Sequence, residues 1–344
     1  MNIKLLLTGG TIGIKSTDSI LDISEKGTSL KLINEFNAAR PDMKVNFSCE
    51  TLFNELSENM TFSHWKQIYN KIKTISKKDC DGIIITHGTD TLAYTAAFLS
   101  LMLKPIEIPV LLVSSNYPIE HEFSNGLCNF VTAVDFIAGV GTNGVFVPFC
   151  NGEAPRIHLG SRLLQSQPFT HCFSSLGGVF YGEIENGVFI RNSNKNNPTP
   201  NCIEKRNTVS IPHFPDEKTI LYLKPYLGAN YSVFDFKNKP DAILHGLYHS
   251  GTACVTRESK KNSIVDFANR CFEQKIDFYV APCDSQHPMY STSKDMKEAG
   301  IVFLKDISCV AAYVKLLIAY GSFTDETERQ NFICNDIACE HFYR

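Results

Sequence analysis

Short runs of buried-type residues alternate with amphipathic stretches along the first half of this chain, and this alternation limits the possible folds most. Ile83–Ile85 is the clearest run, because three successive isoleucines are typical of a strand that is covered on both faces. Strands that alternate with helices predict a parallel sheet with helices on both faces. The expected strands are Ile3–Leu7, Ile83–Ile85, Val110–Val113 and Val145–Pro148, and the expected helices are Ser63–Ile75 (with Ser63 as N-cap), Asp90–Leu103 (capped by Asp90) and Leu127–Phe136.

A polar segment interrupts the alternation at Asn192–Asn207. It contains two prolines and no apolar period, which is typical of a linker or a surface loop. We therefore expect an α/β protein of two α/β domains, with a larger N-terminal, doubly wound, mostly parallel sheet and a smaller C-terminal α/β domain. The predicted boundaries are 1–191 for the N-terminal domain, 192–216 for the linker and 217–344 for the C-terminal domain. In the second domain we expect strands at Thr219–Leu223, Ala242–Leu247 and Asp277–Ala281, helices at Ser263–Glu273 and Ser308–Ala319, and a final helix or tail from Ser322.

Composition excludes several classes of protein. The 344 residues are 43% hydrophobic with a net charge of −3, so there is no basic stripe to meet a nucleic-acid backbone. No stretch approaches the roughly 20 apolar residues of a membrane span, and the N-terminal apolar run is too short for a signal peptide. We expect a cytoplasmic protein. The twelve cysteines contain no C-x-x-C pair, which favours reduced, mostly buried thiols over disulfides or zinc sites.

Two motifs follow predicted strands. Thr8-Gly9-Gly10-Thr11-Ile12-Gly13 comes directly after the first strand, and Thr86-His87-Gly88-Thr89-Asp90-Thr91 lies between Ile83–Ile85 and the next helix. Ligands in doubly wound folds bind beyond the carboxyl ends of strands, and a helix N-terminus stabilises anionic groups. Each motif also has a simpler interpretation, as a Gly-Gly turn in the first case and as helix capping in the second.

These two motifs, in this order, resemble the paired motifs of the bacterial-type asparaginases and glutaminases. Weaker similarities extend over most of the chain, at Asn54–Met60, at Ser124-Asn125-Gly126 and at Tyr290–Gly300, where the similarity is to the cytoplasmic type I enzymes. The resemblance implies an amidohydrolase without metal or cofactor, acting on a small amide as a homodimer or homotetramer.

The resemblance also implies roles for individual residues. Thr11 is the expected nucleophile, with backbone N–H groups near the Gly9-Gly10 turn and Thr89 supporting the oxyanion. Thr89 and Asp90 form a second hydroxyl–carboxylate set, and Ser57 and Asp90 hold the substrate's carboxylate and ammonium groups. The remaining residues of the expected substrate site are Gly10, Gly88 and Ser114.

Three positions depart from the family pattern. Gln165 stands where the family has a catalytic lysine, in Gly160-Ser-Arg-Leu-Leu-Gln165, and a glutamine has no proton to exchange near neutral pH. Between Ile12 and Phe47 there is no tyrosine to match the one that polarises the family's nucleophile, and Ile20 or Leu21 takes its place. Ser114-Ser115-Asn116 replaces a Thr-Gly-Ala/Ser segment. Losing a general base typically costs about 10²–10⁴-fold in rate.

Three hypotheses follow. The first is hydrolysis of L-asparagine to L-aspartate and ammonia, with Thr11, Thr89, Asp90 and Gln165 at the catalytic positions. The second is a weakened relative that binds an amino acid or amide as a sensor or partner. The third is amide transfer to charged tRNA by a related amidotransferase, which the position of the first motif at Thr8 disfavours. Two further motifs carry little weight: Gly139–Gly144 fits G-x-G-x-x-G but follows a helix, and Ser291–Lys294 fits S-x-x-K without its partner motifs.

Overall fold

A computed structural model of the chain describes residues 1–10, 14–17, 20–23, 28–103, 106–139, 142–152, 154–204 and 209–343. The chain divides into two compact units, Met1–Thr208 and Val209–Arg344. Each unit contains its own sheet, so each is described by itself.

The first unit is built on an eight-stranded sheet in the order β10-β9-β8-β7-β6-β5-β1-β4. Its central strands run parallel, and the three pairings from β7 to β10 are antiparallel. The central strands carry residues that are buried on both faces, as the isoleucine run in β5 predicts. The strands are β1 (Asn2–Gly9), β4 (Asn46–Glu55), β5 (Gly82–Thr86), β6 (Pro109–Val113), β7 (Gly144–Phe149), β8 (Arg156–Leu159), β9 (Gly182–Glu185) and β10 (Val188–Arg191), and a separate hairpin is formed by β2 (Ile14–Thr17) and β3 (Ile20–Ile23).

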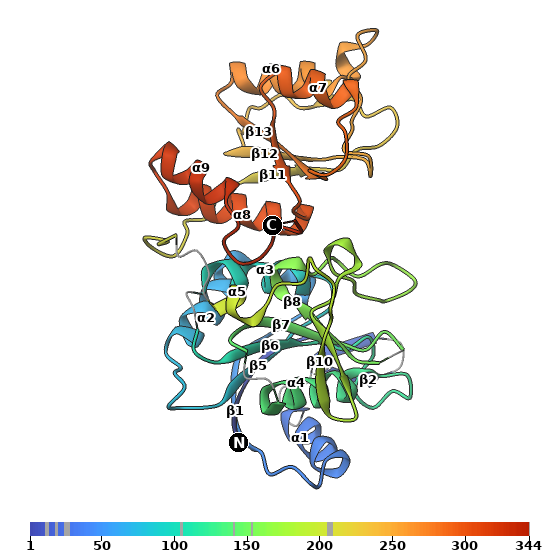
Figure 1. The fold of residues 1–344 in the computed structure, drawn as a ribbon, viewed down its shortest axis with the longest axis vertical. Coiled ribbons are helices and arrows are strands. Elements are labelled where there is room, and N and C mark those ends of the chain that lie inside the picture. Colours follow the sequence, from blue (N-terminus) through green and yellow to red (C-terminus); the bar gives the residue numbers. More distant parts are fainter. Residues whose placement is uncertain are drawn as a thin grey trace. The chain divides into compact units, whose positions relative to one another are not determined.

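Helices cover both faces of this sheet (Figure 1). α1 (Thr28–Ala39) and α4 (Gly126–Gly139) lie on one face, and α2 (Phe62–Lys73) and α3 (Leu92–Met102) lie on the other. The Trp65 ring of α2 stacks on Phe98 of α3 with 4.5 Å between the ring centroids, and Phe136 of α4 packs on Phe146 of β7. The short helices of the unit are η2 (Ser57–Asn59), η3 (Gly160–Arg162), η4 (Leu176–Gly178) and α5 (Pro200–Glu204).

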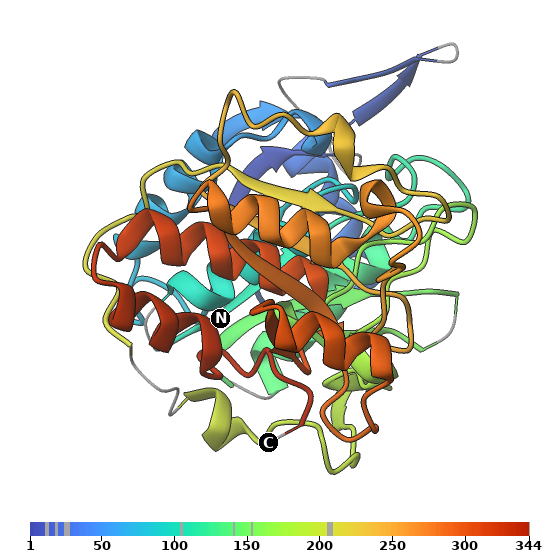
Figure 2. The same ribbon diagram turned by 90° about the horizontal axis from the view of Figure 1, so that it is seen from above.

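The second unit is a four-stranded parallel sheet in the order β11-β12-β13-β14. α6 and α7 lie on one face, while α8 and α9 lie side by side on the other (Figures 1 and 2). The elements are β11 (Ile220–Leu223), β12 (Ala242–Gly246), β13 (Asp277–Cys283), β14 (Val302–Lys305), η5 (Tyr231–Val233), η6 (Lys260–Asn262), α6 (Ile264–Glu273), α7 (Ser291–Glu298), α8 (Cys309–Ser322) and α9 (Glu326–Cys334). The expected fold class, two α/β domains with the larger sheet first, is confirmed.

Two helix starts differ from the prediction. Thr61 rather than Ser63 is the N-cap residue of α2, where it forms a reciprocal capping box with His64. α3 begins at Leu92 with Thr91 at the cap position, so Asp90 does not cap it and lies one residue outside. The exposed carboxylate of Asp90 is therefore not committed to a capping bond.

The polar segment after β10 is packed against the first unit as far as α5. Asn197 is 5% exposed and donates from Nδ2 to the carbonyl oxygens of Tyr181 and Asn192, both at 2.8 Å. The guanidinium of Arg162, also buried, donates to the Asn196 carbonyl at 2.7 Å. Residues 192–204 thus belong structurally to the first unit, although they lie in the predicted linker, and the exact domain boundaries stay a prediction.

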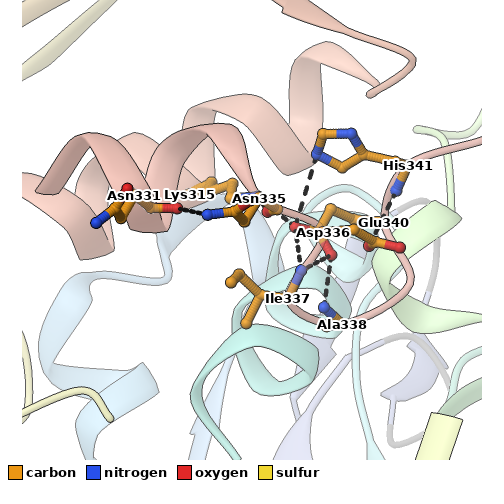
Figure 3. A network of polar contacts seen from close by, with 8 residues as sticks. All are labelled: Lys315, Asn331, Asn335, Asp336, Ile337, Ala338, Glu340 and His341. Carbon is orange, nitrogen blue, oxygen red and sulfur yellow. Dashed lines mark hydrogen bonds and ion pairs between the residues drawn. The ribbon is translucent and has the colours of Figure 1, made fainter. Parts of the chain in front are cut away.

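A buried ion pair fixes the end of the second unit (Figure 3). Lys315 of α8 and Glu340 near the C-terminus are both 0% exposed, and the Lys315 ammonium donates to the Glu340 carboxylate and to the Asn335 carbonyl. The carboxylate also accepts from the backbone N–H groups of Ile337 at 3.0 Å and Ala338 at 2.6 Å. Burial by itself raises the pKa of Glu340, but the Lys315 charge and these hydrogen bonds outweigh it and hold the pKa well below its usual range.

Two general features follow from the described residues. None of their helices is both long enough and apolar enough to pass through a bilayer. All twelve cysteines are thiols, as expected, but only Cys80, Cys271, Cys283 and Cys339 are buried, so the expectation of mostly buried thiols was wrong.

Candidate active site

The two sequence motifs meet where β1 and β5 end. These strands are parallel neighbours, so their carboxyl ends lie at the same edge of the sheet. Thr8 and Thr86 join them there: the Thr8 hydroxyl donates to the Thr86 carbonyl, and the Thr8 backbone N–H donates to the Thr86 hydroxyl at 3.2 Å. The Gly9-Gly10 turn and the His87-Gly88 segment therefore leave the sheet side by side.

Glycines allow the backbones beyond this edge to touch. Gly10 has a φ of +83°, and a Cβ there would lie 2.4 Å from the Gly88 nitrogen. A Cβ on Gly88 would lie 2.5 Å from the Ser57 hydroxyl oxygen. No side chain fits in either gap, so Gly10, Gly88 and Ser57 form one contiguous surface made by segments that follow β1, β5 and β4. The structure thus brings together three of the expected substrate-binding residues.

The N-terminus of α3 borders the same surface. Thr89 is partly exposed and Asp90 is exposed. The Thr91 hydroxyl donates to the Ser57 carbonyl at 2.8 Å, so the start of α3 is bonded directly to the Ser57 segment. A hydroxyl, a carboxylate and the N–H groups of a helix start are then close to one another, which suits a ligand that has both an ammonium and a carboxylate.

His87 is a structural residue of this edge, as expected. It is fully buried, and burial lowers its pKa to about 4, so the imidazole is neutral near physiological pH. Its Nδ1 lies 2.7 Å from the Gly88 carbonyl oxygen, which can only accept, so Nδ1 carries the proton. Nε2 then accepts from the Thr95 hydroxyl at 2.9 Å, and Thr95 in turn accepts from the Trp65 indole N–H at 2.9 Å. This chain of bonds fixes the carbonyl of Gly88.

Ser114 ends the next strand, β6. Its side chain is 0% exposed, and its hydroxyl oxygen has no hydrogen-bond partner among the residues that the structure describes. Its carbonyl accepts from Asn129 Nδ2 at 2.9 Å, which ties the loop after β6 to the first turn of α4. A buried hydroxyl with unused hydrogen-bonding capacity is the kind of group that a polar ligand would satisfy.

Gln165 lies beside α3. Gly160 packs against this helix so closely that a Cβ would be 2.8 Å from the Ser100 hydroxyl, and five residues later Gln165 Oε1 accepts from the Tyr94 hydroxyl at 3.4 Å. The segment thus runs along α3 toward its N-terminus, where Thr89 and Asp90 lie. It is held by a hairpin in which Leu164 N–H donates to the Ser174 carbonyl at 2.9 Å.

Some expected site residues lie outside the described part. Thr11, the expected nucleophile, is one of these, and so are the side chains of Ile20 and Leu21. Three residues that support the site were not predicted from the sequence: Thr95, Tyr94 and Asn129. Thr95 could have been found from its spacing, because it follows Thr91 by four residues and so shares its face of α3. No comparable signal pointed to Asn129.

The second unit contains a cavity of about 570 Å³ within its own fold. The turn after β12 lines it with His249, Ser250 and Gly251, opposite Cys283, Asp284 and His287. Ser291–Lys294 lies on α7, where the Lys294 ammonium is 3.5 Å from Glu298. Gly139 ends a helix and Gly144 starts a strand, the reverse of a dinucleotide-binding loop. Within the described ranges, no cluster of three His, Cys, Asp or Glu side chains could hold a metal ion.

Comparison with known proteins gives consistent results. The family model described as "Asparaginase, N-terminal" matches residues 2–195. The D-type component of the glutamyl-tRNA(Gln) amidotransferase of Methanobrevibacter smithii is 26% identical over 360 residues, covering 98% of this chain and 76% of that protein. Its counterpart from Thermofilum pendens is also 26% identical, covering 87% of this chain and 67% of that protein.

Solved structures share the fold over the whole chain. The thermostable L-asparaginase of Thermococcus kodakarensis superposes with a TM-score of 0.81 at 22% identity and covers 99% of both chains. L-asparaginase I of Vibrio cholerae gives a TM-score of 0.80 at 23% identity, covering 99% of this chain and 98% of that one. A probable cytoplasmic L-asparaginase from Campylobacter jejuni gives 0.73 at 22% identity, covering 97% and 99%.

Proposed function

Because this chain belongs to the asparaginase family, we propose that it hydrolyses the side-chain amide of a free amino acid, converting L-asparagine to L-aspartate and ammonia. The observation that supports this most is the contact of Gly10, Gly88 and Ser57 at the carboxyl edge of the first sheet. Thr11, the proposed nucleophile, follows Gly10 directly in the chain. An amide bound on this surface would lie next to a hydroxyl, backbone N–H groups and the N-terminus of α3.

The proposed reaction has two stages. The Thr11 hydroxyl attacks the side-chain carbonyl carbon, its proton passes to the departing nitrogen, and ammonia leaves behind a Thr11 acyl-enzyme. Backbone N–H groups near the Gly9-Gly10 turn and the Thr89 hydroxyl stabilise the oxyanion. Water then hydrolyses the ester and releases L-aspartate and the free hydroxyl. Ser57, Asp90 and Ser114 bind and orient the amino acid.

Gln165 favours a second candidate function, binding of an amino acid or amide without efficient turnover. Its Oε1 accepts from Tyr94, so its amide group can donate to the site but cannot accept a proton from a threonine near neutral pH. Without another base in that place, the rate would fall by about 10²–10⁴-fold relative to an enzyme with a lysine there. A sensor or partner role then becomes the alternative.

Amide transfer is a third candidate, which the names of the curated relatives favour. Those relatives are amidotransferase components that act with glutamyl-tRNA(Gln) by name. The two enzymatic candidates differ in the preferred amide, because a chain of that kind would take its ammonia from glutamine. One methylene in a pocket is worth only about 1–3 kcal/mol, so the preference has to be measured.

We also propose that the protein is cytoplasmic and assembles as a homodimer or homotetramer. The similarity to a protein titled as a probable cytoplasmic L-asparaginase supports the location. Sedimentation of the purified full chain would test the assembly.

Ammonia release from L-asparagine and L-glutamine, measured for the wild type and for Thr11→Ala and Thr89→Ala, tests the proposed function. We expect release from asparagine that either substitution abolishes. Asparagine binding in calorimetry without release above the background of the variants would instead support the binding function. Release from glutamine in preference to asparagine would support amide transfer.

Gln165→Lys tests the role of the departure, with Gln165→Met as the matched control. Lysine supplies a group that can exchange a proton, so we expect the rate to rise by about tenfold or more, with a new ionisation in the pH profile. Methionine has a similar length but makes no hydrogen bond, and should not raise the rate. Equal rates for both variants would show that position 165 does not reach the reacting groups.

A further inference from the structure

Two thiols are in contact at the same edge of the first sheet. Cys128 lies in the first turn of α4, and Cys150 directly follows β7. Their thiols share a hydrogen bond, and both side chains are partly exposed to solvent. The sulfurs are therefore close, and small reagents can reach them.

The backbone holds these cysteines together independently of the thiol contact. The Cys150 backbone N–H donates to Asn129 Oδ1 at 2.7 Å, and Asn129 is the residue after Cys128. Asn125 Nδ2 donates to the Cys150 carbonyl at 3.0 Å. Two asparagines of one helix start thus clamp both polar groups of the Cys150 backbone, so the sulfurs stay near each other while the helix is intact.

Cys150 also lies between two arms of the candidate active site. Asn129 binds the Ser114 carbonyl through its Nδ2, on the side of the loop after β6. Asn151 exchanges two hydrogen bonds with the Phe173 backbone, at 2.8 and 3.0 Å. Phe173 precedes Ser174, which pairs with Leu164 next to Gln165. A change at Cys150 therefore acts on the segments that carry both Ser114 and Gln165.

The two thiols differ in reactivity. The hydrogen bond from Cys128 lowers the pKa of Cys150 to about 6, although burial opposes this. The same contact, together with burial, raises the pKa of Cys128 far above its usual value. Cys150 is thus the thiolate that attacks first, and Cys128 is the thiol placed to react with it afterwards.

We propose that Cys128 and Cys150 form an oxidisable dithiol, a modification site that low-molecular-weight disulfides convert to an intramolecular disulfide. We further propose that this disulfide slows the reaction at the candidate active site, a consequence that rests on the proposed function. The disulfide itself does not rest on it.

The chemistry balances with one molecule of a small disulfide, RSSR. The Cys150 thiolate attacks one sulfur of RSSR, forming a mixed disulfide and releasing RS⁻. Cys128 loses its proton to solvent, and its thiolate attacks the Cys150 sulfur and releases the second RS⁻. Overall the two cysteines lose two electrons and two protons, and RSSR is reduced to two RSH.

The first test is exposure of the full chain to glutathione disulfide, followed by peptide mapping without reduction. We expect a linked pair of peptides containing Cys128 and Cys150 in the wild type. In Cys128→Ser, Cys150 should keep a stable glutathione adduct, because no second thiol resolves it. The exposed Cys49, on β4, provides the matched control, since Cys49→Ser should form the disulfide as the wild type does. Recovery of mixed disulfides alone at both cysteines of the wild type would overturn the proposal.

The second test measures ammonia release from L-asparagine before and after oxidation. We expect a roughly fivefold or larger loss in the wild type and in Cys49→Ser, reversed by dithiothreitol, and no such loss in Cys128→Ser. If the disulfide forms but ammonia release is unchanged, the link to the active site is wrong. If no reduced form releases ammonia, the proposed function fails while the peptide map still decides on the dithiol.

Discussion

Replacing Lys315 by methionine removes one half of the buried ion pair in the second unit. Methionine keeps most of the apolar volume of the lysine stem but leaves the Glu340 carboxylate without its counter-ion, at 0% exposure. The Asn335 carbonyl loses its donor as well. The backbone N–H groups of Ile337 and Ala338 still bond to the carboxylate.

The cost can be bounded in two ways. Removing one partner of a buried ion pair typically destabilises by about 3–5 kcal/mol. Glu340 can instead bind a proton, which at pH 7 costs about 1.4 kcal/mol per pH unit above an ordinary glutamate pKa of about 4.3, or roughly 4 kcal/mol. The second route sets a ceiling, so we expect Lys315→Met to lose about 3–4 kcal/mol at pH 7 and less near pH 5, where protonation is cheaper.

The sign of this pH dependence differs between the two proteins. In the wild type the pKa of Glu340 is lowered by folding, so its contribution is present above the unfolded pKa and is lost as the pH falls through the folded value. In Lys315→Met the carboxyl is protonated more easily in the folded state. The difference in stability between the two proteins should therefore shrink as the pH falls from 7 to 5.

Urea denaturation followed by circular dichroism would measure this. The single tryptophan, Trp65, lies in the first unit, so its fluorescence provides an internal reference for a change confined to the second. Lys315→Met/Glu340→Gln is the matched control, because glutamine keeps an acceptor for Ile337 and Ala338 without a charge. We expect it to recover most of the loss. A loss below about 1 kcal/mol in the single variant, or a double variant no more stable than it, would refute the reasoning.

Two further predictions concern buried histidines. Thr95→Val should destabilise the first unit by about 2–4 kcal/mol, because it leaves the Trp65 N–H and His87 Nε2 unpaired in the interior; Thr95→Ser, which keeps the hydroxyl, should cost much less in the same urea titration. Burial lowers the pKa of His87 and His245 to about 4 and that of His158 to about 3, so the unfolded chain binds protons first and stability is lost as the pH falls below about 6.5. Unfolding free energies measured between pH 7 and 5 should fall by up to about 1.4 kcal/mol per pH unit for each histidine, and a flat profile would contradict the assigned neutral state.

The sequence predicted the central elements of the fold because their patterns are local. Three isoleucines in β5 and the short apolar runs of β6 and β7 describe strands that are covered on both faces, whatever surrounds them. It did not predict β4, because an edge strand with mostly exposed side chains has no continuous apolar run. The Asn186-Gly187 turn between β9 and β10, with both residues at positive φ, is a hairpin signal that the predicted elements did not include.

The candidate site divides in the same way. The two motifs after β1 and β5 follow from residue types, and parallel strands must end at the same edge, so their meeting was predictable. Only the tertiary structure could show that Gly10, Gly88 and Ser57 touch, that Tyr94 binds Gln165 and that Cys150 lies against Cys128. These contacts join segments that are far apart in the chain, and a single sequence contains no record of which distant backbones approach each other. The sequence by itself therefore determined the fold class and the kind of chemistry, and the packing of distant segments decided which side chains surround it.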